Sequence, residues 1–268
     1  MLGTSRESLQ SIVTALQSVA IDAAALRTSE ELFEVSRVVA TDKALRNFLA
    51  DSGQSVKARS ALMSDLFGGK VGPQALEVLT LIASSRWSSD ADLVGAIESI
   101  AARLAFSYAL STNNLDTVEQ ELFAITRLVQ ANSELQMALT NPALEPQVKA
   151  GVIHDLLSGK VNAVTLLISG HVVSNLRDQR ADTAFSQMSE IAASIRNRTV
   201  AQVKVAINLS QDQTNRLKAV LARIAGTDIS LNVIIDPNIL GGVSVRLGDE
   251  VFDGSIQSRL EQARRVLV

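Results

Sequence analysis

The side chains that most often carry enzyme chemistry are scarce in this chain. It has no cysteine and two histidines, His154 and His171. Without thiols it forms no disulfide, thiolate zinc site or iron–sulfur cluster, and it has no cysteine nucleophile. The histidines are 17 positions apart, which is not the HExxH spacing of a helical zinc site. We therefore predict that the protein holds no metal and no cofactor.

Two glycine-containing segments near the C-terminus could suggest phosphate binding or hydrolysis. Gly241-Gly242 precedes a predicted strand, whereas a phosphate-binding loop places its glycines after a strand and before a helix. A glycine turn or bulge is the simpler interpretation. In Asp253-Gly254-Ser255 a nucleophilic serine would need a base nearby, and neither histidine lies in this segment. A serine N-cap beside an acidic residue explains the triplet better, so we predict no catalytic residue.

The composition is typical of a globular protein that binds neither nucleic acid nor the bilayer interior. The 268 residues are 47% hydrophobic and 20% charged, with a net charge of −3, and no segment is a basic patch. The longest charge-free stretch lies between Lys160 and Arg177, shorter than the roughly 20 apolar residues that span a bilayer. The first ten residues contain no apolar run, so we expect no secretory signal and a reducing cytoplasm.

Much of the chain consists of a sequence that occurs twice. Residues 31–92 resemble residues 121–182 at a constant offset of 90. The sequence Glu-Leu-Phe begins at both 31 and 121, and Gly-Lys-Val begins at both 69 and 159. Because the identities cluster on the same helix faces and at the same Gly-Lys-Val turn, we interpret 1–105 and 106–199 as two copies of one module.

Each copy predicts a bundle of short helices. In the second copy apolar residues recur every three or four positions, as in an amphipathic helix: Leu115, Val118, Leu122, Ile125 and Val129. The segment from Val161 to about Leu176 is apolar on more than one face, so we expect a central helix there. A final helix is predicted from about Ala181 to Asn197. The first copy follows the same plan, with an additional leading helix near residues 9–26.

Residues 200–268 change to strand spacing. Val203, Val205 and Ile207 alternate with polar residues, as in a half-buried strand. A helical stripe and further alternating runs follow, which predict the order β-α-β-β-α. The predicted fold class is therefore mainly α: two tandem all-helical bundles followed by a small α/β C-terminal domain.

The C-terminal domain carries a specific motif. Its residues are Asp236, Pro237, Leu240, Gly241, Gly242, Val243, Arg246, Gly248, Asp253, Gly254 and Ser255. This stretch closely resembles the signature of the delta subunit of F-type ATP synthase, a relative of the mitochondrial oligomycin-sensitivity-conferring protein. The resemblance extends upstream to about residue 105. Residues 1–104 are extra for a usual delta subunit, and their likeness to the second copy is similar to the enlarged delta region of actinobacterial enzymes. One departure is Arg177-x-x-Arg180, where the family commonly has a glycine-arginine turn.

The resemblance implies a mechanical role. The protein would be a non-catalytic peripheral-stalk (stator) subunit that links the alpha/beta catalytic head to the b subunit, so that proton-driven rotation is coupled to ATP synthesis. Implied partners are the N-terminal helix of an alpha subunit, the C-terminal end of b and, as a further neighbour, the beta subunit. The implied location is the cytoplasmic face of the cell membrane, as a peripheral part of the complex. Apolar spacing suggests a groove for the alpha helix lined by Phe106, Ala109, Leu110, Leu166 and Leu167.

Two other classes of protein stay open at this point. One is a cytoplasmic helical-repeat adaptor unrelated to ATP synthase, and the other is an enzyme, such as an esterase that uses Ser255. The motif between Asp236 and Leu260 favours the delta family, because a generic adaptor has no reason to contain it.

Overall fold

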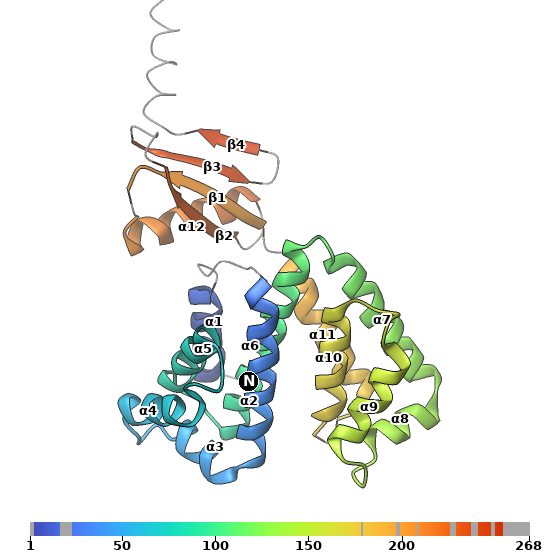
Figure 1. Cartoon of the computed structure of the whole chain (residues 1–268). Helices are drawn as coiled ribbons and strands as arrows, with labels where there is room; N and C mark the ends of the chain where they lie inside the picture. The colour runs from blue at the N-terminus through green and yellow to red at the C-terminus, as the bar shows by residue number, and fades with distance from the viewer. Residues whose placement is uncertain are drawn as a thin grey trace, which may run out of the picture. The chain divides into compact units, whose positions relative to one another are not determined.

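The chain folds into two compact units, each described by itself. The computed structural model describes residues 3–16, 23–177, 179–196, 199–207, 209–225, 229–236, 241–247 and 250–253. One unit comprises Met1–Val13 and Ile21–Ile195 and is helical, and the other comprises Thr14–Ala20 and Arg196–Val268. Figure 1 shows the elements of both units. This mainly α architecture with a small C-terminal α/β part confirms the predicted fold class.

The described residues up to Arg196 form helices only. These are α1 (Thr4–Leu16), α2 (Ala23–Thr41), α3 (Lys43–Ala50), α4 (Val56–Phe67), α5 (Pro73–Ser84), α6 (Asp90–Ser111), α7 (Leu115–Ala131), α8 (Ser133–Thr140), α9 (Pro146–Leu157), α10 (Ala163–Ser174) and α11 (Ala181–Arg196). The bounds repeat with the sequence, because α8, α9 and α10 begin and end 90 residues after α3, α4 and α5.

The turns repeat as well, and so does one of the helix caps. Asp42 caps α3 by accepting a hydrogen bond from the Leu45 backbone N–H, and Asn132 caps α8 by accepting one from the Leu135 N–H. The turns after α4 and α9 each contain a glycine with a left-handed backbone, Gly69 at φ 77° and Gly159 at φ 71°. Glycine adopts this conformation without a steric penalty. The sequence repeat is therefore a repeat of structure.

Helix α6 belongs to both repeats. Its residues 91–106 lie 90 residues before α11, and residues 94–106 of the same stretch lie 90 residues after α1. The boundary placed at residue 105 therefore falls inside one continuous helix. For the same reason the expected leading helix is not an addition to the first copy: α1 ends at Leu16, α2 begins at Ala23, and the second copy has its counterpart in α6.

The shared position of α6 makes it the core helix of the helical unit. Eleven of its residues are buried, and it packs most extensively on α2. Among the described residues, α6 is the one helix that is long enough and apolar enough to cross a membrane, judged by length and composition alone. Here that apolar surface packs against other helices of the same unit. Helix α10 lies where the central helix of the second copy was predicted and buries six residues, including Ile168 and Val172.

The C-terminal unit is a small sheet with a helix. Its elements are β1 (Thr199–Val205), α12 (Gln211–Ala225), β2 (Ile229–Ile235), β3 (Val243–Leu247) and β4 (Glu250–Asp253). The strand order is β2-β1-β3-β4, with β1 and β2 parallel and the other pairs antiparallel. Helix α12 connects the parallel pair, as parallel strands require, and Leu221 joins Val203, Val205 and Val245 in the core. The last predicted helix, from Ser255 onward, lies outside the described residues.

Candidate functional site

The described residues contain no assembled set of metal ligands. Within them, no group of three or more His, Cys, Asp or Glu side chains is placed to hold a metal ion. His154 is exposed on α9, and His171 is on α10, far along the chain from the C-terminal motif. Ser255, the candidate nucleophile, lies outside the described residues.

The motif residues that the structure describes build the turn into β3. Gly241 and Gly242 have φ values of 146° and 85°, which side-chain-bearing residues rarely adopt. They introduce β3, where Val243 packs against the core and Arg246 is exposed. The Asp236 N–H donates to the Val205 carbonyl at 2.9 Å, which ties the end of β2 to β1. Asp253 ends β4, and Pro237, Leu240, Gly248 and Gly254 lie outside the described residues.

The five predicted groove residues fall into two groups. Phe106 and Ala109 are fully buried, because α6 is covered by helices of both repeats. Neither side chain offers surface, so the expectation that they line a groove was wrong in that respect. Leu110 is 37% exposed at the end of α6, and Leu166 and Leu167 are half-buried on α10.

A buried polar cluster joins the two repeats. The Glu98 carboxylate of α6 accepts a hydrogen bond from the Arg177 guanidinium, and the His171 Nε2 atom lies 3.6 Å from the Glu98 Oε1 atom. The His171 ring stacks on Phe33 of α2, with centroids 3.9 Å apart and ring planes at 26°. The Glu98 and His171 side chains are 16% and 8% exposed. Residues from both copies therefore meet in one water-poor contact, which we call the junction.

Burial shifts the protonation of both junction groups toward neutrality. Burial raises the pKa of Glu98 to about 7, against the opposing charge of Arg177. Burial lowers the pKa of His171 to about 3, and the charges of Arg177 and Arg37 add to this effect. Both shifts follow from the cost of a charge in a poorly hydrated site. His171 is thus a neutral ring that packs, rather than a cation.

Sequence reasoning did not find the junction, although the departure from the family pattern at Arg177 pointed to it. Arg177 has a positive φ of 44°, a conformation that favours glycine. The sequence resemblance had already marked this position as one where the family commonly has a glycine-arginine turn. Here the strained arginine reaches Glu98 of the other repeat, which gives the departure a structural reason.

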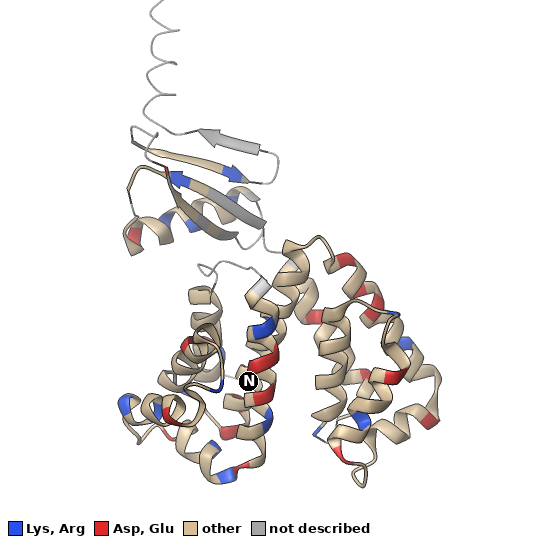
Figure 2. Ribbon diagram, in the orientation of Figure 1, with Lys and Arg blue, Asp and Glu red and all other residues tan. Residues whose placement is uncertain are grey.

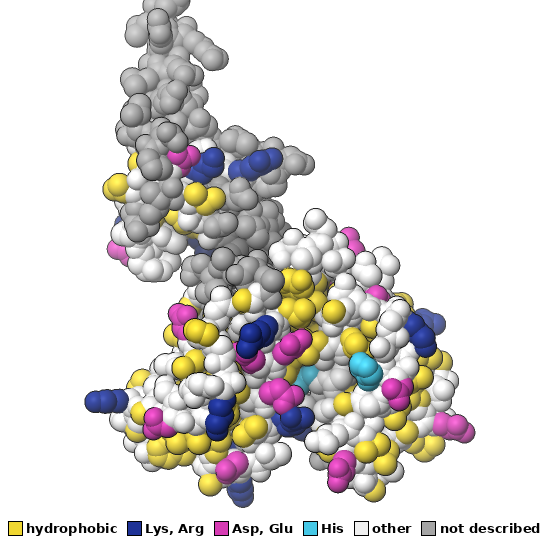
Figure 3. Space-filling model, in the orientation of Figure 1, with side chains coloured by type: hydrophobic (Ala, Val, Ile, Leu, Met, Phe, Trp, Pro, Cys, Tyr) yellow, Lys and Arg dark blue, Asp and Glu magenta, His cyan; other side chains and the backbone are white. Residues whose placement is uncertain are grey.

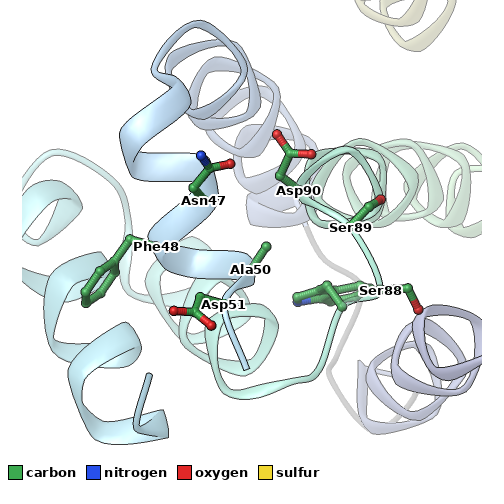
Figure 4. Close-up of a pocket in the computed structure, with 8 residues that line it drawn as sticks. Asn47, Phe48, Ala50, Asp51, Ser88, Ser89 and Asp90 are labelled. Atoms are coloured by element: carbon green, nitrogen blue, oxygen red, sulfur yellow. The ribbon is translucent and has the colours of Figure 1, made fainter. Parts of the chain in front are cut away.

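A shallow cavity in the first repeat has both of its carboxylates engaged. It has a volume of about 520 Å³ and lies between the end of α3 and the start of α6 (Figure 4). The Asp90 carboxylate pairs with Arg46 at 3.1 Å, and the Asp51 carboxylate accepts from the Gly53 N–H at 2.8 Å. Neither carboxylate is therefore free to orient a ligand, which disfavours a small-molecule site here.

The surface of the helical unit is more informative. Figure 2 shows acidic and basic residues interspersed along the helices, which is unlike the basic stripe of a nucleic-acid-binding protein. Hydrophobic side chains reach the surface in many places (Figure 3). Several large ones belong to the second repeat: Phe123, Leu128, Met137, Val148, Val152 and Leu156. Phe123 and Leu128 lie on α7, Val148, Val152 and Leu156 lie on α9, and Met137 is the one member of this set on α8. Exposed apolar side chains that form a contiguous patch are typical of protein-binding surfaces, whereas single ones such as Met137 are common on any protein.

Comparison with known proteins decides the family. The family model "ATP synthase delta (OSCP) subunit" matches residues 13–95 and 97–267. The chain belongs to the ATP synthase delta (OSCP) subunit family. It is therefore a structural component of the peripheral stalk of F-type ATP synthase, a peripheral part of a membrane-bound complex, and the unrelated adaptor has no support. The gap between the two matched ranges falls in α6, the helix that the repeats share.

Curated delta-family relatives share the enlarged form. ATP synthase subunit delta of Parafrankia is 38% identical over 100% of this chain and 99% of the relative. The Streptomyces griseus subunit is 37% identical over 98% and 96%, and the Thermobifida fusca subunit is 36% identical over 100% and 99%. A chain of the Toxoplasma gondii mitochondrial ATP synthase hexamer is similar at 22% identity over 62% of this chain and 94% of that chain, with a TM-score of 0.26. The first helical repeat is thus shared with the actinobacterial relatives.

Proposed function

We propose that this delta-family subunit is a non-catalytic brace that links the alpha/beta catalytic head to the b subunit, so that proton-driven rotation is coupled to ATP synthesis. The observation that carries the proposal is the full-length match to the delta family. The fold supports it, because the contact of Glu98 with Arg177 and His171 joins the two repeats. On this proposal the protein has no reaction of its own and works at the cytoplasmic face of the cell membrane.

The helical unit has the features that a brace needs. The head experiences torque from the rotor, and a static tie must transmit that torque without yielding. Helix α6 has 22 residues and is about 33 Å long at 1.5 Å per residue. It runs through both repeats, and the junction adds a second link between them. Bending one repeat against the other would therefore disturb a packed core helix and a buried polar contact.

The alpha subunit is the first proposed partner. Leu110, Leu166 and Leu167 would line a groove for its N-terminal helix, and the buried Phe106 and Ala109 would support the groove from beneath. Partly exposed leucines on neighbouring helices are the kind of surface that accepts the apolar face of a partner helix. The beta subunit would be a further neighbour on the head.

The b subunit is the second proposed partner, through the C-terminal unit. Val220 and Ile224 of α12 are 51% and 54% exposed and lie one helical turn apart, so they form an apolar stripe. Such a stripe would suit the C-terminal end of a b helix. Modest contacts on alpha and on b would reinforce each other through effective concentration within one complex.

Purification from native membranes tests the proposed function. Tagged protein should recover alpha, beta and b subunits together. Recovery of none of the three would contradict it.

Peptide binding tests the groove. We expect Leu167→Asp to weaken binding of a labelled peptide from the alpha N-terminal helix by at least tenfold, since a charge would enter an apolar contact. Met137→Asp, on α8, is the control that adds the same charge elsewhere. Equal affinity of Leu167→Asp and wild type would remove this groove from the account.

A further inference from the structure

Two equivalent phenylalanines have opposite surroundings. Phe33 of α2 and Phe123 of α7 occupy the same place in the shared sequence Glu-Leu-Phe. Phe33 is 5% exposed and Phe123 is 62% exposed. The preceding leucines, Leu32 and Leu122, are both fully buried, so the two helices have the same rotation within their repeats. The difference therefore lies in what covers the two aromatic rings.

The helices α2 and α7 also hold the same position in their bundles. The Glu31 carboxylate accepts a hydrogen bond from the Gly72 N–H at the start of α5, at 2.8 Å. The Glu121 carboxylate accepts one from the Asn162 N–H at the start of α10, at 3.0 Å. Both contacts join residues 41 apart and are related by the offset of 90. The exposed ring of Phe123 is thus the structural equivalent of a ring that has a partner.

The first repeat shows what covers this position. Phe33 is covered by α10, an apolar helix of the other repeat, whose neutral His171 ring stacks on it. Close to Phe33, Arg37 pairs with Glu34 of its own helix. In the second repeat Ala124 replaces that glutamate, and the Arg127 guanidinium lies 6.0 Å from the centre of the Phe123 ring. Within the described residues no carboxylate pairs with Arg127.

We propose that the α7 face, made of Phe123, Ala124, Arg127 and Leu128, binds an amphipathic helix from a neighbouring subunit of the ATP synthase. This helix presents apolar side chains to Phe123 and Leu128 and a carboxylate to Arg127. All four residues are exposed, and Leu128 is 47% exposed. The inference rests on the proposed function, because that function supplies the neighbouring subunits. It adds a binding surface on α7, away from the leucines of α10.

A second copy of the same chain does not fit this surface in the same way. The side of α10 that covers Phe33 is already occupied within the chain by its own α2. The equivalent position on α5 carries Leu81 in place of His171. A head-to-tail contact of α5 on α7 would also be heterologous, so it would have to close into a ring or continue into a fibre. A different subunit is the partner that closes the contact.

Binding of full-length protein to its purified neighbours tests the proposal. The fluorescently labelled protein is titrated with the alpha/beta head and, separately, with detergent-solubilised b subunit. We expect Phe123→Ser and Arg127→Glu each to weaken binding to one of these partners at least tenfold. Met137→Ser is the matched control, since Met137 is also 62% exposed, and it should change affinity less than twofold. Thermal melting should be the same for all three variants, because these side chains are exposed.

Each outcome is decisive. If wild type binds and Phe123→Ser binds both partners equally well, the α7 face is wrong and the proposed function stands. If wild type binds neither partner, the proposed function and this inference both fail. An equal loss with Met137→Ser would show a non-specific effect and overturn the inference. So would a change seen only in self-association by sedimentation velocity.

Discussion

The first repeat, from α1 to α6, and the second, from α6 to α11, share helix bounds and the cap at the start of α3 and α8, but they differ in their cores and on their surfaces. Arg59 is 2% exposed in the first repeat, whereas its counterpart Lys149 is half-buried. Trp87 fills the first core and donates to the Ile82 carbonyl at 2.9 Å. Its counterpart is Arg177, which instead reaches across to Glu98. The two repeats thus share their helix bounds and turns, whereas other positions differ and become core, junction or surface.

The largest expected effect comes from cutting the chain on either side of the shared helix. A protein that begins at residue 89 keeps α6 with its cap, since Ser89 accepts from the Asp92 N–H at 3.1 Å. We expect it to show a cooperative helical melt by circular dichroism. A protein that begins at residue 106 lacks most of α6 and should not. Equal cooperativity of the two would mean that the second repeat is complete without α6.

The next largest effect is a difference in stability between equivalent substitutions in the two repeats. The buried Arg59 guanidinium donates to the Ser85 carbonyl at 2.6 Å. We expect Arg59→Ala to lower the free energy of unfolding by about 3 kcal/mol, through the lost packing and hydrogen bonding. Lys149→Ala should cost less than about 1 kcal/mol. Urea unfolding of both variants makes the comparison, and similar losses would refute it.

The paired carboxylates of α2 and α7 allow a finer comparison. Glu121 accepts from the Asn162 N–H and from the Thr165 hydroxyl, whereas Glu31 accepts from the Gly72 N–H and from the exposed Arg27. We expect Glu121→Ala to cost about 2 kcal/mol and Glu31→Ala about 1 kcal/mol. Chemical denaturation measures both values, and the reverse order would show that the two contacts are not equivalent.

The smallest effect is a pH dependence at the junction. Because the pKa of Glu98 is raised to about 7, this carboxyl stabilises the fold while it is protonated, and that contribution is lost as the pH rises through 7. His171 has a pKa lowered from 6.5 to about 3, so its contribution is lost as the pH falls from 6.5 toward 3. At any one pH this loss is common to the wild type and to a Glu98 variant, so it cancels when the two are compared.

Replacement of Glu98 by Gln tests this sign. We expect Glu98→Gln to raise the melting temperature by about 2 °C at pH 8, with a smaller gain at pH 5, since the amide cannot ionise. A lower melting temperature at pH 8 would mean that the ion pair with Arg177 outweighs the cost of burying the charge. The control is Gln120→Glu, which changes the charge at an exposed position on α7. Gln136 would not serve, because it is buried.

Local sequence patterns predicted the helices of each repeat. Features that depend on contacts between distant parts of the chain were not predicted. Helix ends were predicted from helix-breaking residues such as Pro146 and Gly159, and α11 lies at its predicted place. The continuity of α6 was missed because the repeat suggested a boundary where the helix has none. Phe106 and Ala109 were assigned to a groove because periodicity shows that a face is apolar, but not which neighbours cover it. The junction joins Phe33, Glu98 and His171, a set that no local window contains.

The central claim is that this protein ties the catalytic head against rotation and performs no reaction itself. Coupling in membrane vesicles tests it most directly. Vesicles depleted of the protein and given back the purified head should hydrolyse ATP but make little ATP from a proton gradient, and adding the protein should restore synthesis. Full proton-driven synthesis without the protein would contradict the claim.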